Sequence, residues 1–291
     1  MGFWKTFFGG EPDEETEKRE AETRNFELLK YDGVKAMRMG QTDYAVKCFE
    51  KALETKDDAE VRDYLSRAYL QLGRYDEALR QLKTVMALEP DNLNLKLQAA
   101  SVAYIKEDYD EMAALCDQAL ALDNESAAAN LFYARAELGR KNMVQAIARL
   151  SRSIALDSEL VEARLVRAQT LLGMGDVKGT REDVDWLKEH TQDNEDVLLA
   201  DARLLAAEGN VTQAMEAYGL VVDANPFCTD AFRERGKLRL DSGDKAGAEE
   251  DMKMVIELNP QEMADVSGDY SAEGIERKTR QAYSNMNPFG I

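Results

Sequence analysis

The sequence predicts an all-α protein, built as a solenoid of helical hairpins that repeat along the chain. Three observations support this fold class. Small and apolar landmark residues recur at a nearly constant interval, which is 33 residues once and 34 residues five times. Apolar residues within each repeat fall at the three- and four-residue spacing of helices. The chain of 291 residues contains five prolines, so long helices can form without interruption.

The repeat register follows from aligning the stretch LGRYDEAL, residues 72 to 79, with the rest of the chain. When Gly73 is numbered position 15 and Ala78 position 20, the seven repeats begin at Phe26, Ala59, Leu93, Ala127, Val161, Glu195 and Thr229. Position 8 holds a small residue in every repeat: Gly33, Ser66, Ala100, Ala134, Ala168, Ala202 and Gly236. Position 24 is mostly large, as in Phe49 of the first repeat. We therefore expect the two helices of a hairpin to approach closely where small and large residues meet.

Glycine and proline mark the ends of the predicted helices in several repeats. Position 15 is glycine in five repeats: Gly40, Gly73, Gly175, Gly209 and Gly243. Proline stands near position 32 in three repeats, at Pro90, Pro226 and Pro260. These residues predict a turn inside each hairpin and a break between hairpins.

The two ends of the chain differ from the repeats. Residues 1–25 form an aromatic arm followed by an acidic segment, and no helix breaker occurs between Pro12 and Gly33. We therefore expect this acidic leading helix to run directly into the first repeat. The repeats occupy residues 26–260, and residues 261–291 are predicted to form a polar capping helix and a C-terminal tail.

A hairpin of 34 residues with small residues at positions 8 and 20 resembles the tetratricopeptide repeat (TPR). The resemblance covers residues 26–260, although the tryptophan that the family carries at position 4 is absent. It implies a right-handed α-α superhelix, a TPR solenoid, with terminal capping helices. It also implies a scaffold that binds a protein or peptide partner in a concave groove lined by the first helix of each hairpin.

The composition of the chain indicates which class of partner and which cellular compartment to expect. The net charge of −19 argues against nucleic acid, because affinity for phosphate backbones comes mainly from lysine and arginine. Cys48, Cys116 and Cys228 lack the short spacings of a zinc site or a disulfide framework, which favours a reducing compartment. No apolar run approaches the ~20 residues of a membrane span. We expect a cytoplasmic protein.

Catalysis is not expected from this sequence. The single histidine, His190, falls in a predicted loop between repeats and has no evident acid or nucleophile partner. Gly173, Gly175 and Gly179 approach a dinucleotide-binding fingerprint but have the wrong spacing and follow no strand. The sequence predicts no catalytic residue, no metal site and no cofactor, so we expect a protein that is not an enzyme.

The predicted groove residues stand at positions 5, 9 and 12, which share one helix face because they differ by three or four residues. They are Arg67, Leu97, Tyr104, Leu131, Arg135, Leu138, Leu165, Gln169, Leu172, Leu199, Arg203 and Lys237. We expect a peptide to place apolar side chains against the leucines and acidic groups against the cations. In the alternative reading, the leucines pack against adjacent helices and the arginines pair with position-2 carboxylates such as Glu60 or Glu162.

A second surface lies at the N-terminus. Phe3, Trp4, Phe7 and Phe8 would form one aromatic face on a helix, which suits contact with a membrane or with a partner protein. This face supports an alternative function, a membrane-associated assembly factor anchored through its N-terminus. The groove reading is the one we favour.

Overall fold

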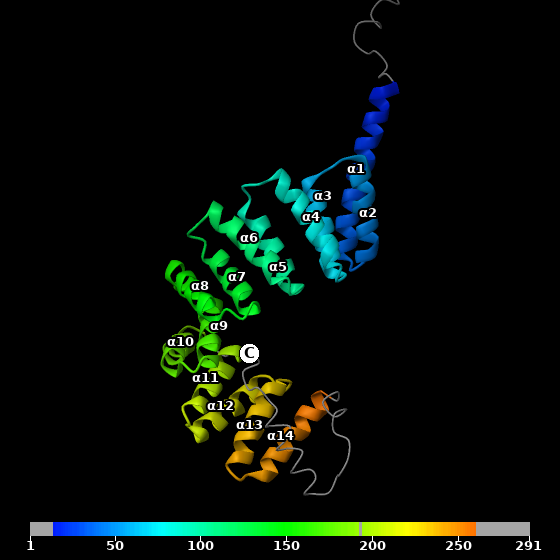
Figure 1. Cartoon of the computed structure of the whole chain (residues 1–291). Coiled ribbons are helices and arrows are strands. Elements are labelled where there is room, and N and C mark those ends of the chain that lie inside the picture. Colours follow the sequence, from blue (N-terminus) through cyan, green and yellow to red (C-terminus); the bar gives the residue numbers. More distant parts are fainter. Residues whose placement is uncertain (1–13, 192–193, 260–291) are drawn as a thin grey trace, which may run out of the picture. The chain divides into compact units, whose positions relative to one another are not determined.

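The computed structural model describes residues 14–191 and 194–259, which form α-helices joined by short turns and contain no strand (Figure 1). The fourteen helices of these described ranges are α1 (Glu14–Arg38), α2 (Thr42–Thr55), α3 (Ala59–Gln71), α4 (Tyr75–Leu88), α5 (Leu93–Ile105), α6 (Tyr109–Leu122), α7 (Ala127–Gly139), α8 (Met143–Leu156), α9 (Val161–Gly173), α10 (Val177–His190), α11 (Glu195–Ala207), α12 (Val211–Ala224), α13 (Thr229–Asp241) and α14 (Lys245–Leu258). The predicted aromatic face of Phe3, Trp4, Phe7 and Phe8 and the predicted capping helix lie outside the described residues.

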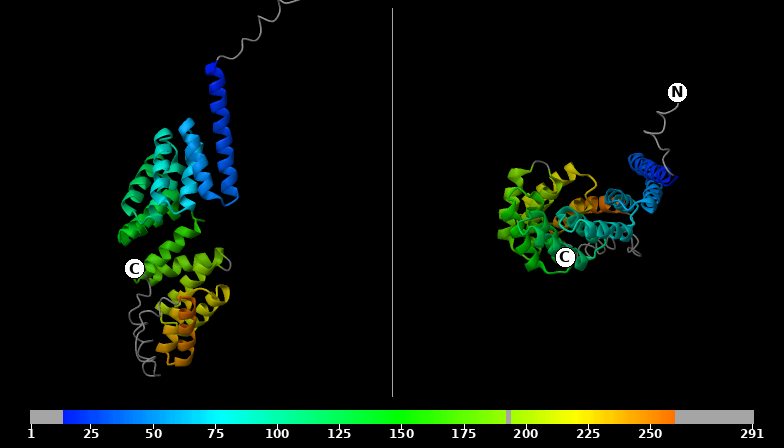
Figure 2. Two further views of the ribbon diagram at one scale, coloured as in Figure 1. Left: turned by 90° about the vertical axis from the view of Figure 1, so that its right-hand side faces the viewer. Right: turned by 90° about the horizontal axis from the view of Figure 1, so that it is seen from above.

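Consecutive helices pack as hairpins, and the odd-numbered helices are the first helices of the repeats. From α3 onward, each first helix begins at the residue that the repeat register numbers as position 1. The first repeat differs, because α1 is one continuous helix of 25 residues that begins at Glu14 (Figure 2). The acidic leading segment and the first helix of repeat one are therefore a single element.

The helices form two compact units, one ending at Ala146 and the other beginning at Ile147, within α8. In each unit the second helix of a hairpin packs against the first helix of the next, as α2 does on α3 and α12 on α13. The N-terminal unit has cores around Phe49 and Leu65 and around Leu82 and Met112. The C-terminal unit has cores around Val184 and around Tyr218 and Val221, and each core combines residues from neighbouring hairpins. Stacking of hairpins therefore supplies the buried apolar surface.

The close approach of small and large residues is visible in repeat one. Phe49 of α2 is fully buried, and a Cβ added to Gly33 of α1 would overlap its ring. Position 8 is therefore small because the position-24 side chain lies directly against the helix backbone.

The turn inside each hairpin requires a left-handed backbone at position 15. The five glycines predicted there have φ angles between 69° and 90°. Repeats three and four carry Glu107 and Lys141 at this position, with φ of 57° and 63°. Side chains of Asp108, Asp176 and Asp244 then cap the second helices by accepting from a backbone N–H three residues on.

The predicted loop position of His190 is wrong, because His190 is the last residue of α10. Its ring stacks on Trp186 with centroids 4.0 Å apart, and its Nδ1 lies 2.8 Å from the Trp186 carbonyl oxygen. These contacts favour a final helical turn that reaches His190. Of the three cysteines, Cys48 and Cys116 are buried and Cys228 is partly buried, and none of the three forms a disulfide.

Candidate functional site

Except for the buried Leu131 and Leu172, the predicted groove residues are partly or fully exposed on the first helices of the repeats. We call the surface that these helices form in each unit the first-helix face. In the N-terminal unit α1 contacts α3 and α5 contacts α7, and in the C-terminal unit α9 contacts α11. In these pairs the first helices are therefore direct neighbours.

Two of the predicted apolar anchors are part of the core. Leu131 is 3% exposed and Leu172 is 5% exposed, so the prediction that they present apolar surface to a partner needs correction. Leu172 packs with Ala168 of its own helix, with Val184 of α10 and with Leu204 of α11. The remaining predicted leucines, Leu97, Leu138, Leu165 and Leu199, are half-buried. The packing of Leu172 against Leu204 of α11 agrees with the alternative interpretation, although Leu172 also lines a pocket.

The first-helix face of the N-terminal unit is more aromatic than predicted. Tyr104 is 43% exposed, and the Arg135 guanidinium lies over its ring at 5.5 Å from the centroid. Tyr31 and Ile105, which we did not predict, are 65% and 49% exposed. They stand at positions 6 and 13, directly after the groove positions 5 and 12. A prediction that also included the residue following each groove position would have identified them.

Charged groups on the N-terminal unit are largely paired with each other. Arg67 forms an ion pair with Asp63 one helical turn earlier, at 2.7 Å. Lys30 of α1 forms an ion pair with Glu60 of α3, and the pKa of the Glu60 carboxyl is lowered by its hydrogen bond with Lys30. The alternative reading expected Glu60 to pair with an arginine. Its partner is instead the position-5 lysine of the preceding repeat.

Arg203 of the C-terminal unit is held by two carboxylates of α13. Its side chain is 19% exposed and lies 2.7 Å from Glu234 and 3.1 Å from Asp230. Burial of the guanidinium lowers the pKa of Arg203, but the hydrogen bond and charge of Glu234 outweigh burial and raise the pKa above its ordinary value. Asp230 stands at position 2, so the alternative reading holds for this arginine. Its charge is already balanced within the protein.

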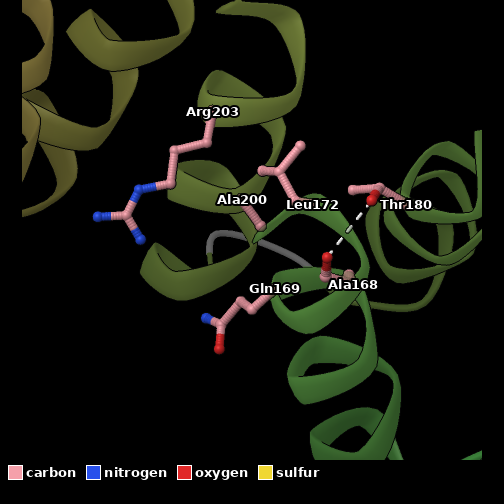
Figure 3. Close-up of a pocket in the computed structure, with 6 residues that line it drawn as sticks. All are labelled: Ala168, Gln169, Leu172, Thr180, Ala200 and Arg203. Atoms are coloured by element: carbon pink, nitrogen blue, oxygen red, sulfur yellow. Dashed lines mark hydrogen bonds between the residues drawn. The ribbon is translucent and has the colours of Figure 1, made fainter. Parts of the chain in front are cut away.

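A pocket of about 150 Å³ opens on the first-helix face of the C-terminal unit (Figure 3). It is lined by Ala168, Gln169, Leu172, Thr180, Ala200 and Arg203. Gln169, Leu172 and Arg203 are predicted site residues, and the structure brings these three together. Lys237 on α13 is half-buried and does not line this pocket.

The pocket exists because small residues line its floor. Ala168 at position 8 and Ala200 at position 6 leave space between α9 and α11. The Thr180 hydroxyl donates to the Asp176 carbonyl oxygen at 2.8 Å, so its polar atom is satisfied inside the protein. Figure 3 shows the Gln169 and Arg203 side chains extending on the same side of the pocket. The floor is therefore apolar and the rim carries an amide and a guanidinium.

The described residues place no nucleophile, base and oxyanion donor together at this pocket. In the same part of the chain, no three metal-ligating side chains cluster. No described helix is both long enough and apolar enough to span a bilayer.

Comparisons with known proteins agree on the repeat type. Two family models, both described as tetratricopeptide repeat, match residues 36–101 and 199–262. A tetratricopeptide repeat protein from Parabacteroides merdae is 16% identical with a TM-score of 0.69, covering 90% of this chain and 100% of that one. The type IV pilus biogenesis factor PilW is 16% identical with a TM-score of 0.63, covering 76% of this chain and 98% of that one.

A third solved structure is similar over a shorter stretch. YrrB, described as a TPR protein with an unusual peptide-binding site, is 16% identical with a TM-score of 0.50, covering 62% of this chain and 94% of that one. Because these three proteins are only 16% identical to this chain in sequence, the structural similarity shows the fold alone. No curated protein sequence matches the chain significantly.

Proposed function

Because the chain is a tetratricopeptide repeat protein, we propose that it is a non-enzymatic scaffold that binds a peptide segment of a partner protein on its first-helix face. Stacked helical repeats create extended surfaces that suit such partners. The observation that carries the proposal is the pocket of the C-terminal unit, which gathers Gln169, Leu172 and Arg203 around an apolar floor.

The pocket suits one apolar side chain of a peptide. Its volume of about 150 Å³ is close to that of an apolar cavity that holds a benzene-sized group. Burying a leucine or methionine side chain there contributes roughly 1.5 to 3 kcal/mol. The exposed Gln169 amide can both donate and accept, so it can bind the backbone of an extended peptide at the rim.

In this proposal, acidic groups on the peptide contribute less to binding affinity than the sequence alone suggested. Arg203 is already paired with Glu234 and Asp230, and Arg67 with Asp63. An incoming carboxylate would have to share these cations. We therefore propose that apolar contact determines affinity in the C-terminal unit, and that the exposed Tyr104 ring supplies aromatic contact in the N-terminal unit.

The test is to fill the pocket without adding charge. Ala200→Leu places a larger side chain on the pocket floor, and Ala155→Leu makes the same change at an exposed site on α8 of the same unit. Partners captured from a lysate of the source organism are compared by mass spectrometry, with circular dichroism to confirm equal helicity. Partners that Ala155→Leu retains and Ala200→Leu loses support the proposal, and an unchanged set of partners in a folded Ala200→Leu protein contradicts it.

The structure argues against testing the groove with a charge at Leu131. A glutamate there would bury an unpaired carboxylate, since Leu131 is 3% exposed. Loss of binding would then report unfolding rather than a blocked site. Gln169→Ala, at an exposed rim position, is the better second variant and should weaken capture without loss of stability.

The alternative function, a membrane-associated assembly factor, depends on the aromatic face of Phe3, Trp4, Phe7 and Phe8 in the sequence. Deleting residues 2–10 separates the two proposals. If deletion abolishes co-sedimentation with membranes, the alternative gains support. If the full-length protein does not co-sediment at all, the soluble scaffold is favoured, and we propose a cytoplasmic location for it.

A further inference from the structure

The first repeat exposes a surface that the later repeats bury. Position 3 is buried in all six later repeats. In repeat two, positions 3 and 10 are Val61 and Ala68, which are 0% exposed and belong to a core shared with α2 of the preceding hairpin. In repeat one the same positions are Leu28, which is 57% exposed, and Lys35, which is also exposed. Among the described residues, no hairpin covers this side of α1.

The same helix continues beyond the first repeat. Residues 14–25 of α1 precede the repeat and are exposed throughout. Figure 2 shows this part of α1 extending past the other helices of the N-terminal unit. A helical segment of this length is marginal in water without a packing partner. A second helix along α1 would therefore stabilise this segment and also cover the open side of the repeat.

Eight exposed residues form a stripe on the open side of α1, with the alternating spacing of three and four residues that a coiled-coil seam has. They are Glu14, Glu17, Ala21, Arg24, Leu28, Tyr31, Lys35 and Arg38, which we call the α1 stripe. The stripe lies on the side of the helix opposite Phe26 and Gly33, which are buried in the unit. Its middle is apolar, its first turn is acidic and its last turn is basic.

The charges of the α1 stripe complement those of a second copy when the two helices run antiparallel. A register that places Glu14 of one copy opposite Arg38 of the other also places Glu17 opposite Lys35. Two-fold symmetry makes each pair occur twice. In the described parts of the chain, none of these four side chains forms an ion pair with another residue. A parallel arrangement would instead place like charges opposite each other.

The same register brings the apolar residues of the two copies together. Ala21 of one copy faces Tyr31 of the other, so a small residue meets a ring that is 65% exposed in the single chain. Arg24 faces Leu28, and the aliphatic stem of an arginine can cover a leucine. The net charge of −19 repels a second copy at long range, but physiological salt screens this repulsion beyond about 8 Å. The paired charges are in direct contact and are screened less.

We propose that the chain forms a two-fold symmetric dimer in which two α1 helices pack antiparallel along the α1 stripe. A second copy of this chain is the partner whose charges and apolar residues match the open side of the first repeat. The dimer goes beyond the peptide-binding function proposed above, because the α1 stripe contains none of the residues that line the pocket between α9 and α11.

Sedimentation equilibrium of the full chain tests the dimer, and we expect a reversible equilibrium between monomer and dimer. Glu14→Lys/Glu17→Lys should raise the dissociation constant by about tenfold or more, because cations then face the cations of the other copy. Glu15→Lys/Glu22→Lys is the matched control. It makes the same change in charge at exposed residues on the opposite side of α1 and should leave the dissociation constant nearly unchanged. Circular dichroism checks that both variants keep the helicity of wild type.

A compensating change tests the antiparallel direction. Lys35→Glu/Arg38→Glu should also weaken the dimer by about tenfold or more. All four reversals in one chain restore opposite charges in each antiparallel pair, so the dissociation constant should return close to that of wild type. Within one chain α1 separates Glu14 from Arg38 by about 36 Å, at 1.5 Å per residue, so pairing inside the chain does not explain such a recovery.

A wild-type chain that stays monomeric at the highest concentrations accessible to sedimentation would overturn the proposal. A dimer whose dissociation constant is the same in Glu14→Lys/Glu17→Lys and in wild type would also overturn it, because the copies would then meet through another surface. If a monomeric wild type becomes a dimer after deletion of residues 2–13, the N-terminal segment of the same chain covers the α1 stripe and the proposal is wrong.

Two single variants complete the test. Leu28→Ser changes an exposed residue without disturbing the core and should weaken the dimer roughly tenfold, because its apolar contact occurs twice at the interface. An unchanged dissociation constant in Leu28→Ser would contradict the proposal. Gln169→Ala, which tests the peptide site, should leave the dimer intact, so failure of one proposal is distinguishable from failure of the other.

Discussion

Arg203 of α11 and Glu234 of α13 join two consecutive repeats through charge-assisted hydrogen bonds. Nε and Nη2 of Arg203 donate to the Glu234 carboxylate at 2.9 and 2.7 Å, and the Tyr218 hydroxyl donates to it at 2.9 Å. Both charged side chains are mostly buried, at 19% and 13% exposed. The pair therefore holds the sixth and seventh repeats together, and its loss should lower the free energy of unfolding.

We predict that Glu234→Ala lowers the free energy of unfolding by about 3 kcal/mol, because it leaves the Arg203 charge buried with only Asp230 as a partner. The double variant Arg203→Met/Glu234→Met should lose about 1 kcal/mol or less, since no charge remains unpaired. Urea denaturation followed by circular dichroism measures both. A loss below about 0.5 kcal/mol in Glu234→Ala would mean that Asp230 and water compensate for the missing carboxylate.

The close contact between Gly33 and Phe49 makes a second prediction. Gly33→Ala should destabilise the protein by about 1 to 3 kcal/mol, although alanine is the better helix former, because its Cβ would overlap the Phe49 ring. Shortening the ring side chain in Gly33→Ala/Phe49→Leu should recover part of this loss. Thermal denaturation of the two variants checks the prediction, and a stabilised Gly33→Ala protein would contradict it.

The sequence was sufficient to predict the repeat fold because the repeat imposes the same packing several times. Gly33 and its counterparts at position 8 are small in all seven repeats, so a local requirement appears as a pattern. The first-helix face was harder to predict. Helix periodicity identifies the residues that share a face, but it does not show which of them neighbouring helices cover. Leu131 and Leu165 both stand at position 5, and only Leu131 is fully buried.

Charge pairing was equally hard to read from the sequence. Arg67 and Arg203 both stand at position 9, yet Arg67 pairs within its own helix and Arg203 pairs with α13. The partner depends on which carboxylates the next repeat happens to carry.

The left-handed turns supply a third prediction. Glu107 and Lys141 adopt positive φ angles that favour glycine, the residue found at this position in the other five repeats. Glu107→Gly and Lys141→Gly should each stabilise the protein by about 0.5 to 1 kcal/mol, because relief of backbone strain exceeds the added entropy of the unfolded chain. Gly73→Ala is the matched reverse change and should destabilise by about 1 kcal/mol. Melting temperatures that move in the opposite directions would contradict this account of the turn.

Tyr69 of α3 supplies a prediction on pH. Its hydroxyl donates to Glu50 of α2 at 2.6 Å and its side chain is 4% exposed. Burial and the hydrogen bond with Glu50 raise the pKa of Tyr69 to about 12. An unfolded tyrosine titrates near pH 10, so the folded state favours the neutral phenol. This contribution to stability is fully present below about pH 10 and is lost as the pH rises from about 10 to 12.

Replacing Tyr69 with phenylalanine should therefore remove a titration step near pH 12 from the ultraviolet absorbance of the folded protein. The free energy of unfolding of Tyr69→Phe should also fall less steeply than that of wild type between about pH 10 and 12, because one group with a raised pKa is gone. Glu50→Gln keeps Tyr69 buried but removes the negative charge beside it, so the remaining step should move to lower pH. If the absorbance of Tyr69→Phe and wild type differs by a step near pH 10 instead, Tyr69 titrates as an exposed phenol and its bond with Glu50 does not hold the proton.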